Sequence, residues 1–195
     1  MRRLVSAAAG LVVAGGLLVI CNEPADADVR SNIRYSGYPV YGQTAQEIWR
    51  DIGRKGPHQR ERGLYAQAEA EIGFGWEIAY ASGGGICRVE GATVHADVNI
   101  ILPHWVDEAR GSEALRRAWN SYIAEVRRHE DHHKDIALVA AKELDRAIMA
   151  APAHRSCRAL ERYIQHAADR ILAWERAQQT HFDRTDEPIM LTGGR

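Results

Sequence analysis

Residues 119–144 read WNSYIAEVRRHEDHHKDIALVAAKEL, and the spacing of side chains in this stretch decides the fold of the C-terminal half. Apolar residues, together with two histidines, recur every three or four positions in the stretch and on both sides of it: Leu115, Trp119, Tyr122, Val126, His129, His133, Ile136, Ala140, Leu144 and Ile148. Such a period predicts one long amphipathic helix. We expect it to begin near Ser112 and to end at Ala150-Ala151-Pro152.

A second helix is predicted after this one, from about Cys157 to Thr180. Its inner face would carry a similar apolar stripe: Leu160, Ile164, Ala167, Ile171 and Trp174. The tail from Phe182 to Arg195 has no pattern that predicts an element.

The period changes to two in the residues before the long helix, which is typical of strands. Strands are predicted at 64–80, 86–89 and 94–102, with turns at Gly83-Gly84-Gly85 and near Glu90-Gly91, and Pro103 would end the last of them. Because the connections are short, we expect these strands to be mostly antiparallel.

An extended segment, 32–44, precedes these strands and leads into a short helix, Ala45 to Ile52. Thr44 and Glu47 have the spacing of a capping box at its start. The predicted fold class is therefore α+β: a mostly antiparallel N-terminal sheet, a β-meander, followed by the long helix and a second C-terminal helix.

The first 27 residues resemble an export signal. A basic start is followed by an apolar run, Leu4 to Ile20, and Ala25 and Ala27 have the small-x-small spacing of a cleavage site. We expect cleavage after Ala27, which leaves 28–195 as one domain in the periplasm or outside the cell. The alternatives are an uncleaved membrane anchor and, less well supported, a lipoprotein built on Cys21.

Charge and cysteine content limit the partners and the cellular compartment that fit this chain. The chain has 25 Lys and Arg against 26 Asp and Glu, so it lacks the basic surface that binds nucleic acid or an anionic membrane. After cleavage of the signal, Cys87 and Cys157 remain, and an even pair in an oxidising compartment predicts one disulfide. Two buried free thiols are the alternative.

His129, Glu130 and His133 form the pattern H-E-x-x-H on the long helix. Four residues turn a helix through about 400°, so both imidazoles lie on one face and can bind one Zn²⁺ ion. Glu130 lies about 100° round the helix, where it can take a proton from a water molecule beside the metal. The alternative, a solvated histidine-rich stretch, is weaker because both histidines fall on the face that the apolar residues mark as buried.

Neighbouring polar residues are interpreted more conservatively. We expect His132 to be exposed or outside the ligand set, and Asp135 to pair with Arg128 or Lys134 on the surface. Three alternating polar residues of the strand at 94–102 share one face: His95, Asp97 and Asn99. We favour a solvent-facing row for them, although a site facing this strand would also fit.

The mature chain resembles a family of exported bacterial proteins, domain of unknown function 922, whose members are predicted zinc-dependent proteases. The resemblance is carried, in order, by Tyr41-Gly42-x-Thr44, Gly56-Pro57, the strand from Trp76 to Tyr80, Cys87, Leu102-Pro103-x-Trp105, Trp119-x-x-Tyr122, His129-Glu130-x-x-His133-x-Asp135-Ile136-Ala137 and Cys157. It implies a zinc site with Glu130 as the base, the Cys87–Cys157 disulfide, and secretion.

The chain departs from the family near its C-terminus, where the family has a Tyr-Asp-x-x-Thr-x-His-Gly segment and this chain reads Phe182-Asp183-Arg184-Thr185-Asp186-Glu187-Pro188. The family's histidine is missing, which leaves the third zinc ligand open. Glu187 is the nearest counterpart, and four other residues compete with it: Asp183, His181, His166 and Glu161.

These observations favour an exported zinc metallopeptidase that hydrolyses a peptide or protein substrate, with Glu130 as general base. Two alternatives use the same residues. One is a non-catalytic exported zinc-binding or interaction module, and the other is a zinc amidase that acts on a non-peptide or cell-wall bond.

Overall fold

The computed structural model describes residues 28–59 and 64–192, and the predicted signal peptide, 1–27, lies outside them. It contains a sheet on the N-terminal side followed by two long helices, so the α+β class is confirmed. The elements are, in order, β1 Asp28–Val40, α1 Ala45–Lys55, β2 His58–Gln59, β3 Leu64–Tyr65, β4 Glu69–Gly83, β5 Ile86–Trp105, a short 3-10 turn Glu108–Arg110, α2 Glu113–Met149 and α3 Cys157–Thr185. No helix in these ranges is long and apolar enough to cross a bilayer.

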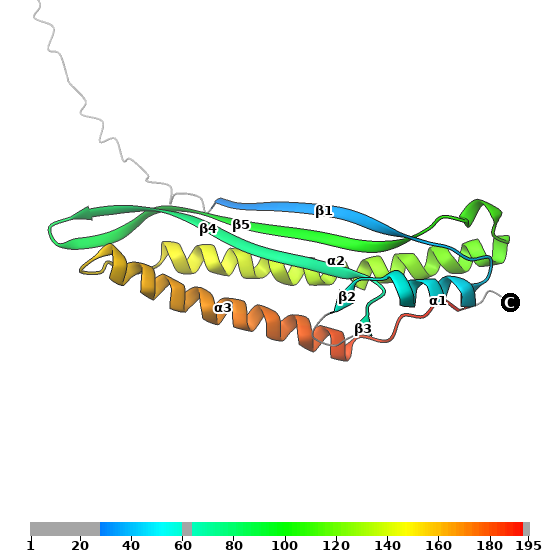
Figure 1. Ribbon diagram of the computed structural model, residues 1–195. Helices are drawn as coiled ribbons and strands as arrows, with labels where there is room; N and C mark the ends of the chain where they lie inside the picture. Colours follow the sequence, from blue (N-terminus) through cyan, green and yellow to red (C-terminus); the bar gives the residue numbers. More distant parts are fainter. Residues whose placement is uncertain (1–27, 60–63, 193–195) are drawn as a thin grey trace, which may run out of the picture.

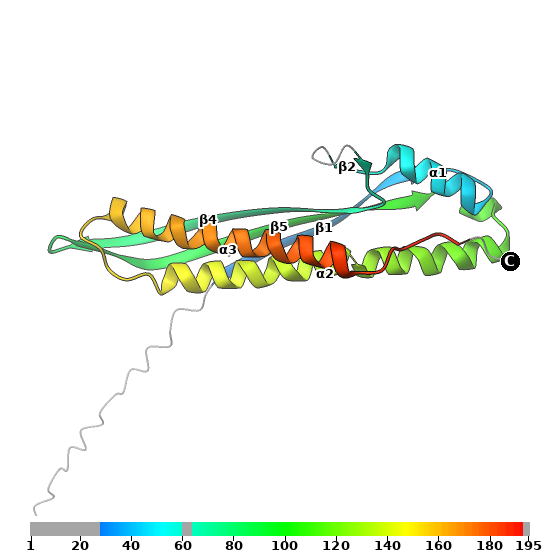
Figure 2. The same ribbon diagram turned by 90° about the horizontal axis from the view of Figure 1, so that it is seen from below.

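The molecule has two layers (Figures 1 and 2). The long strands form one layer, and α2 and α3 run along one face of that sheet, with α1 and the β2–β3 pair at one end. Apolar side chains of β5 and α2 fill the interface between the layers, including Val94, Ile100, Ala141 and Leu144, each with 0% exposure. The opposite face of β5 has polar side chains, and this amphipathic pattern is why one face only is covered by helices.

The β4–β5 hairpin confirms the predicted glycine turn. Gly84 and Gly85 have φ values of 59° and 77°, which β-carbon-bearing residues seldom adopt, so the turn depends on glycine here. β4 then pairs antiparallel with β5 along its length.

The sheet differs from the predicted meander in the place of β1. The strand order is β1-β5-β4, and β1 pairs parallel with β5, so the sheet is mixed. The prediction assumed that strands adjacent in the sequence pair with each other. Residues 41–68 separate β1 from β4 and contain α1, which makes a connection long enough to reach the far strand.

Two predicted breaks in β5 were also wrong. Instead of a turn near Glu90-Gly91, the strand continues with a bulge at which Ala79 and Tyr80 of β4 oppose Gly91 and Val89. Pro103 does not end the strand. It lies beyond Ile101, the last β5 residue paired with β4, so its missing N–H costs no hydrogen bond to that neighbour. The segment at 64–80 is likewise two strands, β3 and β4, and not one.

Both long helices begin at serine caps. Ser112 accepts from the N–H of Leu115 at 3.2 Å, and Ser156 accepts from that of Ala159 at 3.3 Å. The capping box of α1 is present in part: the Thr44 hydroxyl accepts from Glu47 N–H at 3.2 Å, whereas the Glu47 carboxylate accepts from Gln43 N–H.

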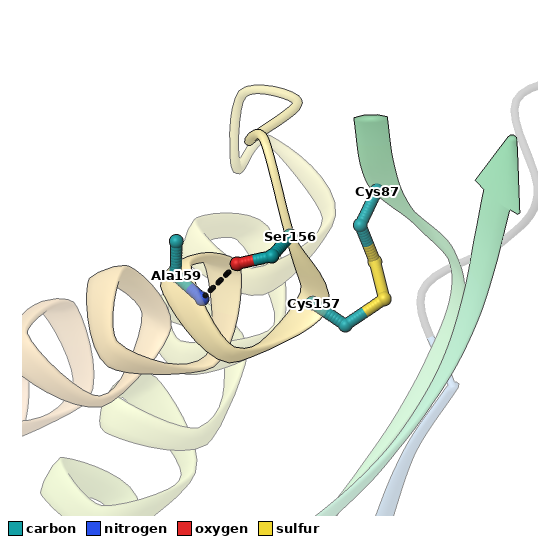
Figure 3. The surroundings of a disulfide bond; sticks show 4 residues. All are labelled: Cys87, Ser156, Cys157 and Ala159. Atoms are coloured by element: carbon teal, nitrogen blue, oxygen red, sulfur yellow. Dashed lines mark hydrogen bonds between the residues drawn. A yellow bond between two sulfur atoms is a disulfide. The ribbon is translucent and has the colours of Figure 1, made fainter. Parts of the chain in front are cut away.

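The Cys87–Cys157 disulfide is formed, with the two Cα atoms 5.1 Å apart (Figure 3). It ties the first turn of α3 to the start of β5, directly beside the Ser156 cap. His154 adds two backbone hydrogen bonds to Cys87, at 2.7 and 2.9 Å. The start of α3 is therefore fixed to the sheet both covalently and by a short β-bridge.

Replacing both cysteines by serine should lower the free energy of unfolding of the mature chain by about 4 kcal/mol, the chain-entropy value for a loop with 70 residues of separation. Urea unfolding of the oxidised parent and the double variant measures the difference. Dithiothreitol should destabilise the parent by a similar amount and leave the variant unchanged. A parent that is equally stable with and without the reductant would contradict the prediction.

Candidate metal centre

His129 and His133 lie on one face of α2, as the spacing predicted, and Glu130 is buried beside them. The Nε2 atoms of the two histidines are 3.1 Å apart. His133 is 9% exposed and Glu130 only 6%, and His129 is partly buried. Two imidazole nitrogens therefore face one position beside a buried carboxylate.

Asp183 of α3 completes this group. Its Oδ1 atom lies 3.0 Å from His133 Nε2 and 3.7 Å from His129 Nε2. One ligand-capable atom from each of His129, His133 and Asp183 lies within 4.8 Å of the other two, so the three residues could hold a metal ion. Donor atoms bound tetrahedrally at 2.0–2.1 Å lie about 3.3 Å apart, so the triangle has the size that zinc requires.

The five candidates for a third ligand are separated by this geometry. Asp183 belongs to the group with the two histidines. The other four do not belong to it in the part of the chain that the structure describes: Glu161, His166, His181 and Glu187. His166 and His181 are exposed on α3, while Glu187 lies in the tail after the helix.

Hydrogen bonds at the far side of each imidazole set its orientation. His129 Nδ1 donates to Asp186 Oδ2 at 2.6 Å, and His133 Nδ1 donates to Gln179 Oε1 at 2.5 Å. The direction at Gln179 is fixed because its amide nitrogen already donates to two acceptors, Glu175 Oε1 at 2.7 Å and the His133 carbonyl at 3.1 Å. Both Nε2 atoms are thus left as acceptors, the form that binds a metal.

Phe182 packs against the same residues. Its ring centroid is 4.6 Å from that of His129 and 4.0 Å from that of His132, which is itself exposed. The imidazole of His129 packs against this ring and donates a hydrogen bond to Asp186, so both contacts fix the position of His129.

Electrostatics in the metal-free protein follow from these contacts. The nearby Asp183 carboxylate, together with the hydrogen bond to Asp186, raises the pKa of His129 above its ordinary value of 6.5. The two neighbouring histidines stabilise the ionised carboxylate and hold the pKa of Asp183 well below its usual range. Burial raises the pKa of Glu130, against the opposing effect of the neighbouring histidines.

Three acceptor atoms that face one position repel one another unless a cation lies between them. A proton can fill that role, which is why the pKa of His129 is raised. A metal ion can fill it with three ligands at once. The donor set of two imidazoles and one carboxylate suits Zn²⁺, so the residues present fit the predicted ion.

The group opens into a cavity of about 530 Å³, called here the site cavity. The cavity lies between the start of β4, the site face of α2 and the end of α3, and its lining residues are Ala66, Gln67, Ala68, Glu69, Ala70, Ile72, Val126, His129, Glu130, His133, Gln179, Asp183, Asp186, Glu187, Pro188 and Ile189. A substrate that enters it would meet the candidate ligands and Glu130 together.

The family model for the bacterial protein of unknown function DUF922 matches residues 35–190. The chain belongs to this family. No curated protein and no solved structure matches the chain. The family match covers every residue that lines the site cavity, from Ala66 to Ile189, but the family's description assigns no activity.

Sequence reasoning missed Glu175, Gln179 and Asp186. The helix was predicted to end at Thr180, whereas α3 continues to Thr185 and so places Asp183 on its last turn. The signal that was overlooked is the spacing of four from Glu175 to Gln179 and from Gln179 to Asp183, which puts three polar side chains on one helix face. The predicted inner stripe was wrong at Trp174, which is 42% exposed, while Glu175 next to it is 5% exposed.

The other polar residues singled out from the sequence lie elsewhere. Asp135 approaches Lys134 at 3.6 Å, as expected for a surface pair. On the outer face of the sheet, Asp97 accepts from Asn32 at 2.9 Å and Asn99 donates to Glu71 at 2.9 Å. His95, Asp97 and Asn99 line a solvent-facing row and are not part of the site cavity.

Replacing His133 or Asp183 by alanine should abolish stoichiometric zinc binding, because either change removes one atom of the triangle. Asp186→Ala should weaken zinc affinity by about 10- to 100-fold, the usual effect of losing a partner that orients a ligand. Zinc content after dialysis and competition with a chelator measure both effects. His166→Ala and His181→Ala are matched controls on α3 and should keep full zinc, and loss of zinc in either would refute the assignment of Asp183.

Zinc affinity should fall as the pH is lowered, because protons compete for the imidazole nitrogens. The raised pKa of His129 places the onset of this competition above pH 6.5. Asp183→Asn removes the largest cause of the raised value and should lower the His129 pKa in the metal-free protein. NMR titration of the imidazole protons measures it, and an unchanged pKa in this variant would be inconsistent with the Asp183 contact.

Proposed function

We propose that this chain is an exported zinc-dependent peptidase whose metal is held by His129, His133 and Asp183. The observation that carries the proposal is the meeting of three ligand-capable atoms, within 4.8 Å of one another, beside the buried Glu130 in the site cavity. The Cys87–Cys157 disulfide fits an exported protein, in keeping with the predicted signal at 1–27.

A bound Zn²⁺ ion would act as a Lewis acid and stabilise negative charge that develops on a scissile carbonyl. Glu130 is the proton acceptor. Its carboxylate takes a proton from the attacking water and later gives it to the leaving amine. Burial raises the pKa of Glu130, which improves its ability to accept that proton near neutral pH.

The residues around the ligands have positioning roles. Asp186 and Gln179 keep the Nδ1 protons of the two histidines on the side away from the metal position. Glu175 holds the Gln179 amide in the matching orientation at 2.7 Å. This chain of contacts fixes two imidazole rings before a metal binds, which lowers the free energy needed to order the site.

The number of ligands favours an enzyme over a structural zinc module. Structural sites have four protein ligands, whereas catalytic sites have three and leave a position for water or substrate. In the described part of the chain, the group around His129 and His133 has one further member, Asp183. Three ligands therefore support catalysis.

Glu130→Gln should keep stoichiometric zinc and lose about 10²- to 10⁴-fold in the rate of peptide hydrolysis, the usual contribution of a general base. The measurement compares zinc content and casein cleavage by the mature parent and the variant. Glu125→Gln, an exposed residue one and a half turns earlier on α2, is the matched control and should cleave like the parent. Zinc in every protein without cleavage by the parent would count against a peptidase.

A further inference from the structure

Within the described ranges, one edge of β4 has no strand beside it. In the sheet order β1-β5-β4, β4 is hydrogen-bonded to β5 on one side and ends the sheet on the other. Such an edge presents backbone N–H and C=O groups that can pair with another extended chain.

The free edge of β4 begins at the site cavity. The cavity touches five consecutive residues, Ala66 to Ala70. Glu69 and Ala70 are successive residues of β4 whose side chains point to opposite faces, so a cavity lined by both meets the start of the strand along its backbone edge. The same cavity holds Glu130 and the two histidines on its α2 side. An extended chain paired with β4 would therefore pass in front of the candidate metal ligands.

The lining of the site cavity is strongly acidic. Among the residues that the structure describes, 28–59 and 64–192, the lining contains five carboxylates and no lysine or arginine: Glu69, Glu130, Asp183, Asp186 and Glu187. A bound Zn²⁺ ion would neutralise two of these charges and leave an excess of three negative charges. Arg128 lies close enough to lower the pKa of Asp186, but it is not part of the lining.

We propose that the substrate of this site is an extended, basic polypeptide segment, which pairs with the free edge of β4 and places lysine or arginine side chains near Glu69 and Glu187. This substrate class rests on the proposed peptidase function. Backbone pairing accounts for the extended form, and the unbalanced carboxylates account for the preference for positive charge. Acidic peptides of the same length would be repelled by the cavity.

The first test measures binding without turnover. Zinc-loaded mature Glu130→Gln is titrated, by fluorescence anisotropy, into a labelled peptide with several lysines and into a matched peptide with glutamate at those positions. The lysine peptide should bind at least about tenfold more tightly at low salt, and the difference should shrink as salt screens the charges. Equal binding, or tighter binding of the glutamate peptide, would overturn the charge preference.

Variants then locate the charges. In the same Glu130→Gln background, Glu69→Gln and Glu187→Gln should each reduce the preference for the lysine peptide by severalfold. Glu77→Gln is the matched control, because Glu77 is an exposed residue of the same strand outside the site cavity. A loss in the control equal to that in Glu69→Gln would show a general charge effect and overturn the assignment.

Backbone pairing is tested with lysine peptides that carry N-methyl groups at alternate positions, in the two opposite registers. N-methylation removes the amide donors that would face β4 in one register and those facing solvent in the other. The peptide methylated in one register should bind about tenfold more weakly than the unmethylated peptide, and the peptide methylated in the other register should keep its affinity. Equal affinity of both for the protein would overturn pairing with the edge.

The outcome for this substrate class can be separated from that for the peptidase function. Active parent enzyme is assayed on casein and on neutral, basic and acidic peptides. Cleavage of casein and of all three peptides at similar rates would overturn the basic preference and keep the peptidase. Absence of cleavage in every assay, with zinc bound, would overturn both.

Discussion

The packing of α3 against α2 is the constraint on which the candidate centre depends. α2 supplies two imidazoles, and α3 supplies the carboxylate, the glutamine and the aromatic ring that contact them. Asp183 lies 26 residues after Cys157 on the same helix, which is about 39 Å at 1.5 Å per residue. A shift of α3 by one residue would move Asp183 by about 1.5 Å and turn it by about 100°, out of reach of both histidines.

Contacts at three places along α3 fix that register. The disulfide and the β-bridge at His154 hold the first turn of α3 to the start of β5. Leu160 and Ile164, with 0% and 2% exposure, then pack into the core formed with the sheet and α2. Polar contacts at the far end, from Gln179 to His133, complete the series. The centre is therefore held by a covalent bond at one end of a rigid helix and by hydrogen bonds at the other.

A second set of contacts shapes the wall of the site cavity opposite α3. The Gln67 carbonyl accepts from Tyr38 at 2.7 Å, its side-chain oxygen accepts from Tyr122 at 2.9 Å, and its amide donates to Ile189 at 3.2 Å. One residue thus connects β1, α2 and the C-terminal tail. Burial raises the pKa of Tyr122 far above its ordinary range, so the hydroxyl is protonated and able to donate at neutral pH.

Gly56 allows the same wall to close. A β-carbon at this position would lie 2.0 Å from the carbonyl oxygen of Ala66, so any other residue would push the start of the cavity edge away from α1. The tail is anchored as well, because Leu191 is 7% exposed in the core beside Trp119 and Tyr122. The cavity edge at 66–70 is therefore a supported surface and not a free loop.

Patterns among neighbouring residues predicted the elements that depend on interactions between neighbouring residues. The step of three or four residues through Trp119 and Leu144 predicted α2, and the three consecutive glycines predicted the hairpin turn. The pairing of Cys87 with Cys157 was predicted from their number and from the expected export. The place of β1 and the third member of the centre were not predicted, because both depend on contacts between residues far apart in the sequence. Asp183 could be named as a candidate, but its selection requires the register of α3 against α2.

The position of Glu130 follows from the geometry of the helix that carries the histidines. One residue after His129, its side chain is turned about 100° from the ligand face and reaches the site cavity that borders the β4 edge. A residue on the ligand face would compete for the metal, and a residue on the opposite face would reach solvent. The same turn buries Glu130 between α2 and the sheet, and burial raises its pKa. A single helical step thus separates the proton acceptor from the ligands and sets the environment that tunes it.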